Sequence, residues 1–170
     1  MKQSRDFESE SYLSGVVQAM AIEIAIRAQR SAKPKSYGTL YWQFNDAWPA
    51  ISWAAVDYYG RWKPLQYMAK RMYTNIAVFT LTTSVVVAIN DNLYPTDVIV
   101  KMANVDFEGN IISKDQKIMT LAADSVATVF NINRASLTDK ITKVVTVTEI
   151  YHKDSLVMRS TRYYKPYKEL

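Results

Sequence analysis

Two short runs decide the fold: VVVAIN at residues 85–90 and VIVKMA at residues 98–103. In each run, successive side chains fall on opposite faces, which is the period of a β-strand. Comparable runs follow at residues 126–130, 145–151 and 156–160. Short strands at regular spacing are typical of a β-sandwich or barrel.

Turn-forming residues separate these runs. They are NDN at 90–92, EGN at 108–110, AD at 123–124 and HKDS at 152–155. About seven short strands with regular turns over this half of the chain predict an immunoglobulin-like β-sandwich. The half has no cysteine pair and no tryptophan, so the sequence excludes an antibody-type domain.

The first part of the chain has a helical pattern instead. A helix is predicted over residues 9–31, with Ser9 or Ser11 as its cap and Pro34 as its stop. Its apolar stripe follows the 3.6-residue period. The stripe consists of Leu13, Val16, Val17, Met20 and Ile24.

A strand and a second helix complete this first part. The aromatic run at residues 39–44 predicts a buried strand. Pro64 suits the first position of a helix over residues 64–73, which carries Leu65, Met68, Ala69 and Met72 on one side.

The spacing of the apolar residues changes near Asn75 from the helical period to the alternation of strands. This change predicts one domain over residues 1–75 and another over residues 76–170. A single helix–strand–helix unit cannot close a sheet. We therefore expect the first part to be the tail of a larger α/β domain. The fold class is α + β.

Composition narrows the function. With 49% apolar and 22% charged residues, the 170-residue chain has the composition of a folded protein. The net charge of +5 comes without a dense basic run, so neither a nucleic acid nor a membrane is expected as partner. No stretch reaches about 18 apolar residues, and the first residues lack the apolar core of a signal peptide.

Metal and nucleophile chemistry are also restricted. The chain has no cysteine and one histidine, His152, which we expect to be an exposed turn residue. This excludes thiolate and His-paired metal sites and argues against a Ser–His–Asp triad. No cofactor is expected.

Three tryptophans fall within residues 42–53. Indole faces beside Asn45 and Asp46 suit a sugar, whose ring packs on the aromatic face while its hydroxyls meet fixed polar groups. A buried aromatic cluster under a loop explains the same composition, and both interpretations stay open at this point.

The run from Gly38 to Tyr67, GTLYWQFNDAWPAISWAAVDYYGRWKPLQY, resembles the end of the catalytic barrel in β-mannosidases of glycoside hydrolase family 2. The helix before this run and the β segment after it, which closes on YYKPYK at 163–168, also resemble that family. The resemblance implies the last helix–strand–helix of a (β/α)8 barrel followed by an immunoglobulin-like sandwich. Residues 9–31, 39–44 and 64–73 would be the seventh helix, the eighth strand and the eighth helix of that barrel.

The resemblance also implies a substrate-binding set. Active sites of such barrels lie at the C-terminal ends of the strands. Trp42 matches the strand-eight tryptophan that forms an apolar platform beneath the terminal sugar, whereas Trp48, Trp53 and Trp62 are interpreted as structural residues that wall the pocket or bridge to the β domain. The set consists of Trp42, Gln43, Asn45, Asp46 and Trp48.

The family's retaining mechanism needs two carboxylates about 5–5.5 Å apart. In the family these glutamates come from the fourth and seventh strands, which would precede this chain. Glu8, Glu10 and Glu23 match neither motif, and Asp46 and Asp57 are expected to fix the loop. The expectation is a C-terminal fragment of an exo-β-mannosidase that has no catalytic residue and is inactive alone.

Two other functions remain open. One is a non-catalytic carbohydrate-binding or scaffold module built on the sandwich, and the other is a family 2 relative that acts on another β-glycoside. A β-mannoside or related carbohydrate is the expected partner of the parent enzyme, and the exposed barrel remnant predicts a homodimer. The compartment stays open, since periplasm, secretion and lysosome all suit the parent.

Overall fold

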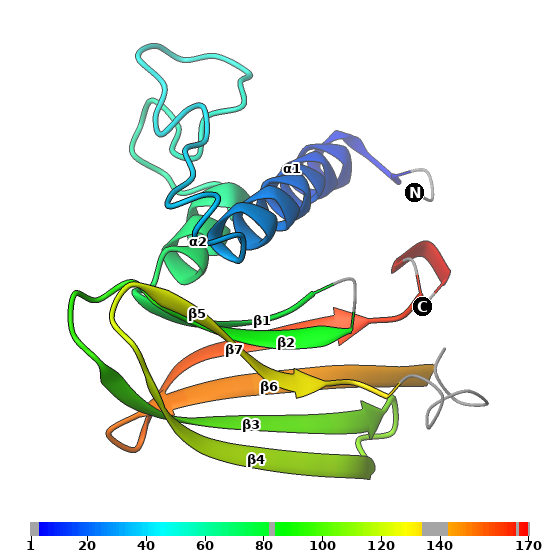
Figure 1. Cartoon of the computed structure of the whole chain (residues 1–170). Helices are drawn as coiled ribbons and strands as arrows, with labels where there is room; N and C mark the ends of the chain where they lie inside the picture. Colours follow the sequence, from blue (N-terminus) through cyan, green and yellow to red (C-terminus); the bar gives the residue numbers. More distant parts are fainter. Residues whose placement is uncertain (1–3, 82–83, 134–142, 166, 170) are drawn as a thin grey trace. The chain divides into compact units, whose positions relative to one another are not determined.

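A computed structural model describes residues 4–81, 84–133, 143–165 and 167–169 (Figure 1). Residues 1–3 and Pro166, which enter the sequence analysis, lie outside the described residues. The chain divides into two compact units, Met1–Tyr73 and Thr74–Leu170.

The first unit contains α1 (Phe7–Arg30) and α2 (Pro64–Met72). Both predicted helices are confirmed, but the cap of α1 is Asp6 rather than Ser9 or Ser11. The backbone N–H of Ser9 donates to Asp6 Oδ1 over 2.7 Å, so Ser9 already lies in the first turn. This hydrogen bond lowers the pKa of Asp6.

The face of α1 that packs within its unit differs from the predicted stripe. Ala19, Ile26 and Arg30 are buried, whereas Val17 and Ile24 are exposed. The start of α2 packs closely against α1 at Gly15, because a Cβ at this position would lie 3.2 Å from the Pro64 ring. The side chains of the predicted stripe therefore stay partly or fully exposed.

The strand predicted at residues 39–44 does not form, and this prediction is wrong for the unit as it stands. The segment is irregular, and beside it lies an isolated parallel bridge between Asn45 and Val56. A strand needs a neighbouring strand for its backbone hydrogen bonds, and the described residues of this unit supply none over residues 39–44.

The described residues of the second unit form seven strands and a short 3-10 helix. They are β1 (Ile76–Thr80), β2 (Val85–Asn90), β3 (Thr96–Asp106), β4 (Ile111–Leu121), β5 (Ser125–Asn131), β6 (Val144–His152), β7 (Ser155–Tyr163) and η3 (Tyr167–Glu169).

These strands form two antiparallel sheets, in the orders β1-β2-β5 and β4-β3-β6-β7. The sheets lie face to face (Figure 1), so the predicted immunoglobulin-like sandwich is confirmed. Alternation in β3 sends Val98, Val100 and Met102 into the core, where Phe79 and Ile150 are also fully buried.

The predicted turns lie between the strands, and several carry the backbone that such turns require. Gly109 has φ 90°, and Lys153 and Asp154 have φ 47° and 61°. Positive φ at two successive residues is the signature of a tight hairpin turn. The alternation analysis located neither β1 nor β4, because β1 is buried along its whole length and most of β4 is exposed.

Candidate functional site

The tryptophan-rich loop between the helices is held by its own backbone. Ala55 N donates to Gln43 O over 3.0 Å, and Val56 N donates to Phe44 O over 2.9 Å. Lys63 N then donates to Ala55 O over 2.9 Å. The loop thus folds back twice on itself. Ala55 anchors it to a small core formed with Ala19 and Leu65.

Asp46 is the internal brace of the loop. Its side chain is buried, with 7% of the residue exposed. Oδ1 accepts from the Ser52 hydroxyl over 2.5 Å, and Oδ2 accepts from Lys63 Nζ over 3.3 Å. Lys63 also donates to Ser52 O, so three residues from separate turns of the loop are linked.

Asp57 closes the next turn. Its Oδ1 accepts from the backbone N–H groups of Tyr59 and Arg61, and its Oδ2 accepts from Arg61 Nε over 2.6 Å. Partial desolvation raises the pKa of Asp57, but the hydrogen bonds and charge of Arg61 outweigh this effect, so the pKa lies below its usual value. The prediction that Asp46 and Asp57 fix the loop is confirmed by these bonds.

The braced loop presents its large rings to solvent. Trp42 is 75% exposed, Trp48 is 69% exposed and Trp53 is 60% exposed. Trp62 instead packs edge-on against Tyr67, with ring centroids 5.2 Å apart. These three rings are therefore not packed in a core within the described residues.

The remaining predicted polar residues lie in the segment that directly follows Trp42. Gln43 Nε2 donates to Asn45 O over 3.0 Å, and Asn45 Nδ2 donates to Asp46 O over 3.2 Å. The peptide bond between Trp42 and Gln43 is cis. The two hydrogen bonds link Gln43, Asn45 and Asp46 into one segment next to Trp42 in the chain.

Sequence reasoning missed Ser52 and Lys63 as partners of Asp46. Both lie in the run from Gly38 to Tyr67, but no repeating pattern in the sequence indicates a contact between residues 46 and 63. It arises only when the loop folds back.

His152 differs from the expectation of an exposed turn residue. It is the last residue of β6 and is only partly exposed, and its Nδ1 donates to Asp97 O over 2.9 Å. Within the described part of the chain, no three metal-binding side chains cluster, and no helix has the length and apolarity needed to cross a bilayer.

The whole chain is similar to a β-D-mannosidase of known structure. It superposes on the crystal structure of the enzyme from Dictyoglomus thermophilum with a TM-score of 0.91 at 27% identity, over 100% of this chain and 21% of that chain. The exo-chitosanase CsxA of Amycolatopsis orientalis matches 94% of this chain with a TM-score of 0.78. At 15% identity, the second match concerns the fold alone.

Curated relatives match over a shorter stretch. The β-mannosidase of Mus musculus is 41% identical over 76 residues, which are 41% of this chain and 9% of that protein. β-Mannosidase B of Aspergillus clavatus is 41% identical over 81 residues, which are 46% of this chain and 10% of that protein. The matched stretch is thus about a tenth of these relatives' length.

A family model decides the assignment of the sandwich. The model described as the Mannosidase Ig/CBM-like domain matches residues 82–169, which is more than half of the chain. The resemblance to the C-terminal part of family 2 β-mannosidases is confirmed by this match and by the relatives named above. The chain belongs to the Mannosidase Ig/CBM-like domain family.

Proposed function

We propose that this chain supplies the C-terminal part of a retaining glycoside hydrolase that removes terminal β-mannosyl groups, and that its tryptophan-rich loop lines the sugar pocket. The observation that carries the proposal is the loop itself, which holds Trp42 and Trp48 exposed on a backbone braced by Asp46. Exposed aromatic rings on a rigid support are typical of a binding surface, since a solvated monomer rarely keeps them.

The roles within the pocket follow from this geometry. Trp42 is the apolar platform, because an indole face packs against the C–H groups of a pyranose ring. Gln43 and Asn45 offer amide groups to hydroxyls at the edge of the ring. Asp46 already accepts hydrogen bonds from Ser52 and Lys63, so its part is to hold the loop, while Trp48 forms a wall.

The reacting carboxylates come from elsewhere in this proposal. A retaining glycosidase needs one carboxylate as nucleophile and another as acid and base. Asp46 is buried against Lys63, and Asp57 is paired with Arg61, so neither is available as a nucleophile aimed at a sugar. The glutamates of the fourth and seventh barrel strands take these roles, and the chain by itself does not hydrolyse glycosides.

The exposed stripe of α1 supports the assignment to a barrel. Leu13, Val16 and Met20 are half-buried, and Val17 and Ile24 are exposed, although all five are aliphatic or thioether side chains. In a (β/α)8 barrel one face of each helix packs on the central sheet. In the whole enzyme we expect this stripe to pack there and residues 39–44 to become the eighth strand.

A chimaera tests the proposal. This chain replaces the matching 21% of the Dictyoglomus thermophilum β-D-mannosidase, and hydrolysis of 4-nitrophenyl β-mannoside is measured beside that of the chain alone. We expect turnover by the chimaera and none by the chain. A folded chimaera that cleaves only β-glucosaminide or β-glucoside would instead support the relative with another specificity.

Trp42→Ala in the chimaera tests the platform. Truncating a central tryptophan typically costs about 2 kcal/mol of binding, so kcat/KM should fall about thirtyfold. Trp62→Phe is the matched control, because Trp62 packs on Tyr67 and has no assigned sugar contact. Equal losses in both variants, or none in Trp42→Ala, would contradict the role of Trp42.

A further inference from the structure

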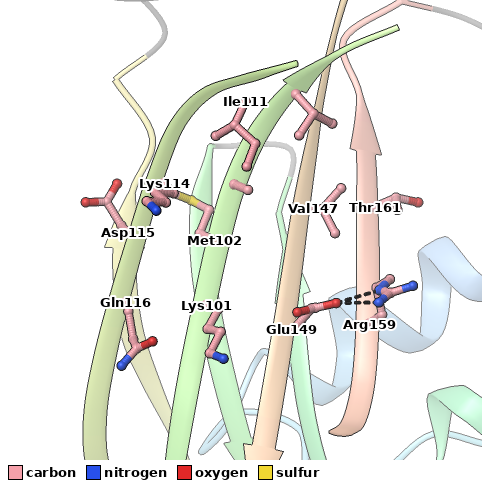
Figure 2. A pocket seen from close by; sticks show the side chains of 12 residues that line it. Lys101, Met102, Ile111, Lys114, Asp115, Gln116, Val147, Glu149, Arg159 and Thr161 are labelled. Atoms are coloured by element: carbon pink, nitrogen blue, oxygen red, sulfur yellow. Dashed lines mark hydrogen bonds and ion pairs between the residues drawn. The ribbon is translucent and has the colours of Figure 1, made fainter. Parts of the chain in front are cut away.

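A concave surface lies on the sandwich, on the outer face of the four-stranded sheet (Figure 2). It is a groove of ≈ 790 Å³, which falls within the usual range for ligand sites, about 300–1,000 Å³. Side chains from all four strands line it, including Lys101, Gln116, Glu149 and Arg159. None of these residues belongs to the tryptophan-rich loop.

Strand register builds one wall of the groove. Lys101 of β3 is opposite Gln116 of β4 and Glu149 of β6, and Glu149 is opposite Arg159 of β7. Residues that pair in this way point to the same face of a sheet. Four polar side chains therefore stand in one row across the strands.

The next row is the floor. Ala103 is opposite Lys114 and Val147, and Val147 is opposite Thr161. The small side chain of Ala103 leaves a depression between the polar row and Ile111 at the far side. The strands are about 4.8 Å apart, so the trough runs roughly 14 Å from β4 to β7.

The polar wall is preorganised. Glu149 Oε1 accepts from Arg159 Nε over 2.7 Å, Glu149 Oε2 accepts from the Tyr151 hydroxyl over 2.7 Å, and Lys101 Nζ lies 4.5 Å from the centre of the Tyr151 ring. Partial burial raises the pKa of Glu149, but the hydrogen bonds from Tyr151 and Arg159 and the positive charges of Arg159 and Lys101 lower it by more. The pKa therefore lies below its ordinary value, and the carboxylate is ionised at neutral pH.

We propose that this groove binds a neutral oligosaccharide, at a site separate from the sugar pocket of the first unit. The wall mixes an ionised carboxylate with ammonium and guanidinium groups, so a polyanion meets Glu149 and a polycation meets Lys101 and Arg159. Hydroxyl groups both donate and accept and are uncharged, so one sugar satisfies both kinds of partner. Within the floor, Ala103 and Val147 are the apolar side chains between Lys114 and Thr161, and they suit the C–H face of a sugar ring.

The tryptophans allow a clean test, because all four lie at residues 42–62 and none lies in the sandwich. Mannohexaose and cellohexaose, two neutral hexasaccharides, are titrated into the ¹⁵N-labelled full chain. We expect amide shifts in β3, β4, β6 and β7 whether or not the tryptophan fluorescence of the first unit changes, and a Kd that does not change between low and high salt.

Two variants and a control define the site. Lys101→Ala should weaken binding about tenfold, since one hydrogen bond to a charged group is lost. Ala103→Phe fills the trough without removing a polar group and should abolish binding. Lys117→Ala lies on the same exposed edge strand but points to the opposite face, and should bind like the parent. Thermal melting checks that each variant is folded.

Several results would overturn the proposal. They are shifts confined to residues 38–67 with quenched tryptophan fluorescence, unchanged binding by a folded Ala103→Phe variant, and no shift at millimolar hexasaccharide. A salt-sensitive preference for heparin over both hexasaccharides would assign the groove to a polyanion instead. The chimaera's activity depends on the first unit, so failure of one proposal does not imply failure of the other.

Discussion

Asn90 is a buried polar side chain of the sandwich that makes several hydrogen bonds. It is fully buried at the end of β2, where the chain leaves the three-stranded sheet. Its Nδ2 donates to Tyr94 O and Ala122 O, each over 2.9 Å, and its Oδ1 accepts from Asn92 N over 3.1 Å. One amide thus joins the β2–β3 connection to the end of β4.

Asn90→Leu keeps most of the side-chain volume and removes these three bonds. At about 1 kcal/mol of net stability per hydrogen bond, the expected loss is about 3 kcal/mol. For a unit of this size, that loss lowers the melting temperature by roughly 12 to 24 °C. Two carbonyl groups and one N–H would be left without their partner.

Urea unfolding followed by far-UV circular dichroism measures the loss, and hydrogen exchange of the β2 and β5 amides places it in the sandwich. The control is Asn110→Ala, which removes an exposed bond of 2.9 Å to Asp106 and should cost no more than about 0.5 kcal/mol. If Asn90→Leu cost no more than the control, the buried hydrogen bonds of Asn90 would not be what stabilises this corner of the sandwich.

Three further results are expected. Lys117→Val should increase aggregation in light scattering, because a charge on the inward side of the edge strand β4 discourages pairing with another chain; unchanged scattering would contradict this role. Glu149→Gln should lower the melting temperature at pH 7 but not near pH 3. A carboxylate whose pKa is lowered in the folded state stabilises the fold at pH values above its ordinary pKa of 4.5, and this stabilisation is lost as the pH falls through the folded-state pKa. An equal change in melting temperature at both pH values would refute this prediction. Val17 is 41% exposed on an apolar stripe, so Val17→Lys should weaken any self-association in analytical ultracentrifugation, and a parent chain that is monomeric at every concentration would contradict the expected dimer.

Local patterns in the sequence were enough for the elements whose signal repeats along the chain. The alternation in residues 85–90 and 98–103 predicts two strands of the sandwich, and Pro64 with its apolar neighbours predicts α2. The sequence analysis also predicted that Asp46 and Asp57 fix the tryptophan-rich loop, and both accept hydrogen bonds from it. These inferences succeed because the period of side-chain burial is a property of a single strand or helix.

Only the tertiary structure decided which side chains meet. The row from Lys101 to Arg159 depends on the register between strands that are far apart in sequence, and the bond from Lys63 to Asp46 depends on how the loop folds back. The segment at residues 39–44 has the composition of a strand but stays irregular, because composition does not supply a hydrogen-bonding neighbour. Periodicity thus indicated both helices and the strands β2, β3, β5, β6 and β7, whereas non-local pairing determined which side chains form the two proposed sugar sites.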